Sequence, residues 1–135
     1  DDAWVAAQAT DGYPYMVQLV GYYMWQSAQR RHSDAITKDD VVSGIADAQI
    51  AFDDAVCAPA LDGLRSAEIE FLHALTTDYP SATAVGDIAS RTGRSRSWVN
   101  KYRAALIKDK IIRPAGHGLV AFAVPHLGDY LKRTV

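Results

Sequence analysis

The sequence predicts a mainly α-helical protein in two parts: a small helical bundle over residues 1–60, and a domain over residues 61–135 in which helices precede a β-hairpin. Apolar residues recur at three- and four-residue intervals, the spacing of one face of an α-helix. Short β-prone runs occur only near the C-terminus, around a turn rich in Pro and Gly. The charge balance also reverses, because residues 1–63 hold ten acidic and three basic side chains, whereas residues 64–135 hold six acidic and eleven basic ones.

Composition and termini exclude several classes of protein. The 135 residues are 49% hydrophobic and can bury an ordinary core. The single cysteine, Cys57, has no partner for an internal disulfide, and the four histidines show no metal-ligand spacing, so no metal is expected. No apolar run approaches the roughly 20 residues that span a bilayer, and no signal peptide opens the chain. We therefore expect a cytoplasmic protein without a membrane partner and, because the chain does not begin with Met, a piece of a longer protein.

Two helices are predicted before residue 32. A short one covers residues 3–9, and a long one covers residues 14–31, where apolar side chains form a broad helical face. Pro14 suits a first helical turn, where its missing N–H costs nothing. Arg30 and Arg31 fall in the last turn, where cations complement the exposed carbonyls.

A third helix is predicted to begin after Thr37. Thr37 is a candidate N-cap and Asp40 stands three residues later, a pattern typical of a capping box. Apolar residues then follow at intervals of four, three and four, one stripe of a helix, at Val41, Ile45, Ala48 and Phe52. These helices together predict a small bundle.

The segment 58–64 is predicted to be a boundary, because Pro59 and Gly63 interrupt it where the charge reverses. The helices expected after it run from Ser66 to Pro80, from Thr83 to Arg91 and from Ser95 to about Asp109. Two β-prone runs, 111–113 and 119–124, then favour a hairpin, and the tail can form a last helical turn or two. This order of elements is that of a winged helix-turn-helix domain.

A helix-turn-helix needs a small residue on its first helix, a glycine in the turn and an apolar residue on its second helix. Ala89, Gly93 and Val99 have that spacing, and Ser95 or Ser97 can cap the second helix. The residues expected inside are Ile88, Ala89, Val99, Tyr102 and Leu106.

The same stretch is strongly basic. Eight Lys or Arg residues and a single acid, Asp109, lie between Arg91 and Arg113, although the whole chain has a formal net charge of -2. Such a field attracts a phosphate backbone, and Arg or Asn near a helix start can contact base edges in the major groove. The residues predicted to contact double-stranded DNA are Arg94, Ser95, Arg96, Ser97, Asn100, Lys101, Arg103, Lys108, Arg113 and His117.

Other interpretations of these features remain open. A basic helix face can be merely solvated, and winged helices also mediate protein contacts, so a protein-interaction or autoinhibitory module is the alternative function. Arg103 can be partly structural, and Trp98 is better explained by packing than by base stacking. Residues 22–25, YYMW, are better explained as core than as a contact surface. No catalytic arrangement of nucleophile and base is present, so an enzyme is not expected.

Two stretches together resemble a known family. TDGYPYMVQLVGYYMWQSA, followed by the third helix and then GRSRSWVNKYRAALIKDKIIRPAGHGLVAFAVPHLGDYL, resembles the C-terminal portion of archaeal-type AAA+/STAND-like P-loop ATPases. That resemblance implies a helical lid followed by a winged helix, and a parent protein that binds ATP with an N-terminal ATPase domain. Gly12-Tyr13-Pro14 looks like the Gly-x-Pro motif at which such lids approach the nucleotide. A plain helix-start turn explains the same three residues equally well.

The sequence also departs from that family. It contains no GxxxxGK[ST] phosphate loop, so this chain cannot itself hydrolyse ATP and needs no cofactor of its own. No arginine stands at the start of the helix over 14–31, where many AAA+ lids carry a sensor arginine. The implied role is therefore a non-catalytic lid joined to a winged helix that binds double-stranded DNA under nucleotide control by the parent.

Overall fold

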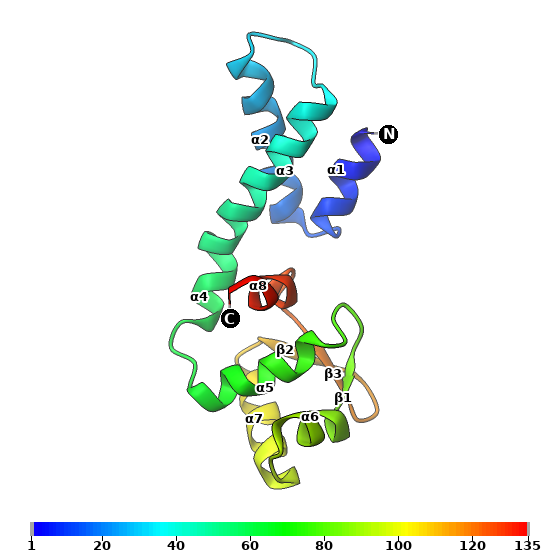
Figure 1. Ribbon diagram of the computed structural model, residues 1–135, viewed down its shortest axis with the longest axis vertical. Coiled ribbons are helices and arrows are strands. Elements are labelled where there is room, and N and C mark those ends of the chain that lie inside the picture. The colour runs from blue at the N-terminus through cyan, green and yellow to red at the C-terminus, as the bar shows by residue number, and fades with distance from the viewer. Residues whose placement is uncertain (1, 135) are drawn as a thin grey trace. The chain divides into compact units, whose positions relative to one another are not determined.

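The computed structural model describes residues 2–134 and divides the chain into two compact units, Asp1–Val56 and Cys57–Val135 (Figure 1). The sequence analysis placed the division at residue 60. The prediction of a mainly helical chain is confirmed, and the strands form a single small antiparallel sheet within the described part.

The first unit is built from α1 (Asp2–Thr10), α2 (Pro14–Arg30) and α3 (Lys38–Phe52). Pro14 stands in the first turn of α2, and Thr37 caps α3 as predicted. α2 packs along α3, and α1 contacts both. The apolar side chains buried between these helices include Met16, Val20, Ala28, Val41, Ala48 and Phe52.

The chain stays helical where it passes from the first unit to the second, including part of the segment 58–64 that the sequence predicted as a boundary. A short π-helix, Asp53–Cys57, leads into α4 (Ala58–Leu61). The remaining elements, in chain order, are α5 (Ser66–Thr76), β1 (Thr83–Ala84), α6 (Val85–Thr92), α7 (Arg96–Lys108), β2 (Ile112–Gly116), β3 (Leu119–Phe122) and α8 (Leu127–Thr134).

The sheet has the order β1-β3-β2, with both pairs antiparallel. β2 and β3 form the predicted hairpin. β1 was not predicted, because the sequence analysis assigned its residues to the start of a helix. Thr83 pairs with Val120 and Ala84 with Leu119, so this two-residue strand exists only through a partner far along the chain.

The hairpin turn is short and is held by the start of α6. His117 and Gly118 make the turn between the strands, and Gly118 has a φ of 68°, which favours glycine. The backbone N–H of Val85 donates a hydrogen bond to the Gly118 carbonyl at 2.9 Å. This hydrogen bond therefore ties the hairpin turn to Val85, the first residue of α6.

The core of the second unit lies where α5 contacts α6, α7 and α8. Ile88, Val99 and Leu106 are fully buried as predicted, whereas Ala89 and Tyr102, which were also expected inside, are half-buried. Other buried apolar residues of this core are Phe71, Leu72, Leu75, Ile112, Leu127 and Leu131.

Candidate nucleic-acid interface

The turn between α6 and α7 has the local geometry that the sequence predicted. Gly93 follows α6 with a φ of 67°, a left-handed conformation that residues with a Cβ adopt at a cost. Of the two candidate caps, Ser95 is the one used: its hydroxyl accepts a hydrogen bond from the Trp98 N–H at 3.1 Å. The left-handed turn at Gly93 and the cap at Ser95 together fix where α7 starts.

Trp98 holds α7 against its neighbours. Its ring stacks on Phe71 of α5 at a centroid distance of 6.4 Å and contacts the Tyr102 ring at 4.9 Å. Together with the buried Val99, these contacts fix which side of α7 faces the core. The half-buried Trp98 is thus a packing residue.

The opposite side of α7 is exposed. At about 100° per residue, residues three and four apart share a face, so Ser97, Asn100 and Ala104 form one line along the helix. All three are exposed, as are Arg96, Lys101 and Lys108. Ala104 was not among the predicted contacts, although its position four residues after Asn100 could have indicated it.

Arg103 lies at the edge of this face. It lies two residues, or about 200° around the helix, from Lys101, and it is half-buried. Its Nε atom is buried without a hydrogen-bond partner in the described structure. Arg103 is therefore placed at the edge between the packed and the exposed sides of α7, about 20° around the helix from Arg96 and away from Lys101 and Lys108.

Two arginines of the basic stretch are engaged in ion pairs. Arg94 donates to both carboxylate oxygens of Glu70, at 2.8 and 3.1 Å, and its guanidinium lies 5.2 Å from the Trp98 ring centroid. Arg91 donates to Asp78 at 2.7 and 3.3 Å and to the Ala74 carbonyl at 2.8 Å. Hydrogen bonds from these arginines lower the pKa values of Glu70 and Asp78. The charge of Arg94, a predicted DNA contact, is thus largely compensated within the protein.

Within the basic stretch from Arg91 to Arg113, the cations left for a partner lie on α7 and just after it. Arg96, Lys101, Lys108, Lys110 and Arg113 are exposed, and no carboxylate among residues 2–134 lies within ion-pair distance of them. Of the two predicted hairpin contacts, Arg113 lies on β2 and His117 in the exposed turn.

In the first unit, Gly12-Tyr13-Pro14 forms the start of α2. Gly12 has a φ of 71° and Pro14 occupies the first helical turn. Tyr13 is half-buried, and its ring meets the buried Phe52 ring edge-on at a centroid distance of 5.6 Å. The three residues thus have a structural role within this unit.

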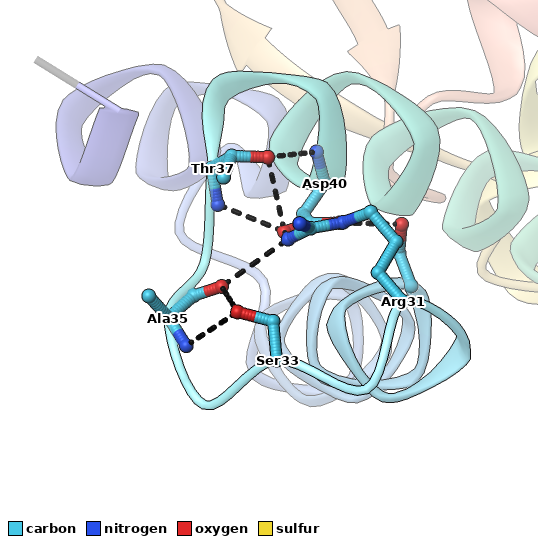
Figure 2. Close-up of polar contacts among 6 residues, drawn as sticks. Arg31, Ser33, Ala35, Thr37 and Asp40 are labelled. Atoms are coloured by element: carbon cyan, nitrogen blue, oxygen red, sulfur yellow. Dashed lines mark hydrogen bonds and ion pairs between the residues drawn. The ribbon is translucent and has the colours of Figure 1, made fainter.

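Asp40 connects the end of α2 to the start of α3. Its side chain is 1% exposed and accepts hydrogen bonds from the Arg31 guanidinium, the Ser27 hydroxyl at 2.8 Å and the Thr37 N–H at 2.8 Å. Figure 2 shows the Arg31 guanidinium between this carboxylate and the Ala35 carbonyl, and it donates to both. The hydrogen bond from Arg31, followed by that from the Thr37 backbone, holds the pKa of Asp40 well below its ordinary value.

This arrangement predicts a pH dependence. Because the folded-state pKa of Asp40 lies below the ordinary 3.8, its stabilising contribution is complete above that pH and is lost as pH falls toward the folded value. The Asp40→Asn variant should be less stable at pH 7 and take up about one proton fewer per molecule on acid unfolding. Chemical denaturation between pH 2 and 7 measures both effects. Asp39→Asn is the control and should keep the wild-type pH profile; equal profiles for both variants would contradict the prediction.

The first unit exposes large apolar side chains. Tyr22 and Trp25 on α2 are 52% and 54% exposed, and Trp4 on α1 is 62% exposed. Tyr23 and Met24 are half-buried. The interpretation of residues 22–25 as core is therefore wrong for Tyr22 and Trp25, which lie on the solvent side of α2.

The protein is thus a mainly helical chain. In its second unit the basic helix α7 follows the tight turn at Gly93 and exposes one side to solvent. The chain belongs to the family DUF8462, described as a domain of unknown function, whose model matches residues 54–131. The matched residues include most of the second unit and lie beyond α3. No curated protein and no solved structure matches the chain. Among the described residues, no helix is both long and apolar enough to cross a membrane.

Proposed function

We propose that the second unit is a winged helix-turn-helix module that binds double-stranded DNA through α7. Its elements follow the order expected of such a module: α5, β1, α6, α7 and then the hairpin of β2 and β3. The observation that carries the proposal is the exposed side of α7. There Arg96, Lys101 and Lys108, which have no carboxylate partner in the described structure, flank uncharged side chains.

Some cations of the basic stretch are paired with carboxylates of the protein and others are not, and this difference supports a polyanionic partner. A cation that is already paired inside the protein gains little from a phosphate, because it must first give up its own carboxylate. Exposed cations without a carboxylate partner keep their charge for an incoming phosphate, and each phosphate neutralised releases condensed counterions. Arg96, Lys101 and Lys108 are therefore the main phosphate contacts of this proposal, with Arg113 and His117 at the hairpin as secondary ones.

We further propose that the first unit is the non-catalytic lid of a P-loop ATPase that controls the DNA-binding module. The support is the family resemblance together with the helix start at Gly12-Tyr13-Pro14, where Gly12 and Pro14 are exposed. In this proposal the ATP and the N-terminal ATPase domain belong to the parent protein. Tyr13 is packed on Phe52, so Gly12 and Pro14 are the residues best exposed to a nucleotide.

A fluorescence titration of the full chain against a labelled duplex tests the DNA proposal. We expect binding at low salt, with log affinity falling against log salt by about 0.9 for each phosphate neutralised. The double variant Arg96→Ala/Lys101→Ala should bind more weakly and lower that slope by about 1.8. The control is Lys38→Ala/Lys132→Ala, which removes the same charge from exposed sites on α3 and α8.

The alternative function is a protein-interaction or autoinhibitory winged-helix module that docks on the ATPase core or another partner. The exposed aromatic side chains Trp4, Tyr22 and Trp25 of the first unit offer a further apolar surface for a protein partner. The same titration separates the two functions. Absence of duplex binding at low salt, or equal losses for the α7 variant and its control, would reject DNA binding and leave the protein-interaction function.

A further inference from the structure

On the exposed side of α7, charged and uncharged side chains occupy separate lines along the helix. Ser97, Asn100 and Ala104 form an uncharged line, while Lys101 and Lys108 lie together to one side of it, about 20° apart around the helix. Arg96 lies to the other side, toward α6, where its Nη1 atom is 3.7 Å from the place that a Cβ on Gly86 would occupy. Contacts to phosphates set the position of a protein on DNA, whereas contacts to base edges set its sequence preference. The uncharged line is therefore the part of α7 suited to read sequence.

Asn100 is the side chain on this line with a specific complement. Its amide is exposed and has no hydrogen-bond partner in the part of the chain that the structure describes. The amide offers one acceptor and one donor side by side, which matches the N6 donor and N7 acceptor of adenine in the major groove. Guanine presents two acceptors there and satisfies only the donor. Asn100 therefore favours adenine.

Ala104 adds a second, apolar preference. It lies one helical turn beyond Asn100, about 6 Å along the axis, which corresponds to roughly two base-pair steps of 3.4 Å. Its exposed methyl group has no polar function, and a thymine C5-methyl is the apolar group that the major groove presents.

We propose that α7 selects A·T base pairs, with Asn100 bound to an adenine and Ala104 against a thymine methyl within about two base pairs. This inference rests on the proposed function, because it requires α7 to enter the major groove of a duplex. It assigns sequence preference to two residues that carry no charge, and it leaves Lys101 and Lys108 to bind phosphates of any sequence.

Modified bases can test each contact separately. Duplexes bound by the full chain are first selected from a randomised library. The adenines of the selected site are then replaced one at a time by 7-deazaadenine, which lacks N7, and the thymines by deoxyuridine, which lacks the methyl group. We expect one 7-deazaadenine substitution to weaken wild-type binding by at least about fivefold, the lower end of the range for a bidentate base contact.

The Asn100→Ala variant should bind the intact and the 7-deazaadenine duplex equally, while Ala104→Gly should become insensitive to the deoxyuridine change. Alanine is a good helix former and Asn100 has no partner in the described structure, so Asn100→Ala should keep the fold. For Ala104→Gly, the melting temperature is measured alongside. Lys108→Ala is the matched control: it should weaken binding to every duplex by the same factor.

The outcomes separate this inference from the proposed function. If the wild-type chain binds duplexes but selects no adenine, or if Asn100→Ala still discriminates against 7-deazaadenine, the sequence preference is wrong and DNA binding stands. If the wild-type chain binds no duplex at low salt, both proposals fail. Equal binding of intact and modified duplexes by Asn100→Ala, with discrimination retained by Lys108→Ala, supports the assignment.

Discussion

Replacing Phe52 with alanine should destabilise the first unit by about 3–5 kcal/mol, the usual cost of removing a buried phenylalanine ring. Phe52 is fully buried at the end of α3, and the rings of Tyr13 and Tyr15 lie 5.6 and 6.1 Å from its ring. A whole domain is commonly stable by only about 5–15 kcal/mol, so this loss is a large part of the total for a unit of this size. Urea denaturation and amide hydrogen exchange within residues 2–56 measure it.

The control is Ile50→Ala, two residues earlier on the same helix, where the side chain is 61% exposed. That variant should change the free energy of unfolding by less than about 0.5 kcal/mol. Similar losses for the two variants would show that Phe52 is not the central core residue of this unit.

The same variant bears on the role of Tyr13. A double-mutant cycle of Tyr13→Ala with Phe52→Ala should give a coupling of about 0.5–1.5 kcal/mol, typical of an edge-to-face aromatic pair. A coupling near zero would mean that the Tyr13 ring does not depend on Phe52 and is free to meet a nucleotide. The cycle therefore weighs the structural role of Gly12-Tyr13-Pro14 against the nucleotide role that the family resemblance implies.

Local signals were the predictable part of the fold. The capping box of Thr37 and Asp40, the turn at Gly93 and the cap at Ser95 each depend on residues within a few positions of one another, and all are present. Such signals satisfy backbone groups that no distant residue has to supply. The start of α3, the end of α6 and the start of α7 follow from them.

Features that depend on distant partners could not be predicted. β1 needs β3, which lies more than thirty residues later, and its two residues have no strand signal of their own. Arg91 and Arg94 were counted as free cations because their partners, Asp78 and Glu70, become neighbours only when α5 packs on α6. Sequence shows the number of charges in a stretch but not which of them remain unpaired after folding.

The sequence predicted most of the residues of the candidate interface, but it predicted less well where they lie around α7. Helical periodicity places Lys101 and Lys108 on one side of α7, and both are exposed there. The same periodicity separates Arg103 from them and adds Ala104. The apolar positions Val99 and Leu106 also gave the direction of the core, but the contact of Trp98 with Phe71 of α5 depends on a distant partner and could not be predicted.

Two glycines of the first unit should respond in opposite directions to the same substitution. Gly44 of α3 is buried against α2, and a Cβ there would lie 2.7 and 2.8 Å from the backbone N and Cα of Met24. Backbone atoms cannot rotate away, so Gly44→Ala would have to push the two helices apart. Overpacking of this kind costs about 1–3 kcal/mol or more, which outweighs the gain of up to about 1 kcal/mol from alanine in a helix.

Gly21 of α2 is the matched control, because it is exposed and nothing lies within 4 Å of the place that its Cβ would take. Gly21→Ala should therefore stabilise the unit by about 0.5–1 kcal/mol through helix propensity alone. Urea denaturation of both variants measures the change in the free energy of unfolding, which should be a loss for Gly44→Ala and a gain for Gly21→Ala. Stabilisation by Gly44→Ala would mean that α2 and α3 cross with room to spare, and the close approach at Met24 would then not be what sets their separation.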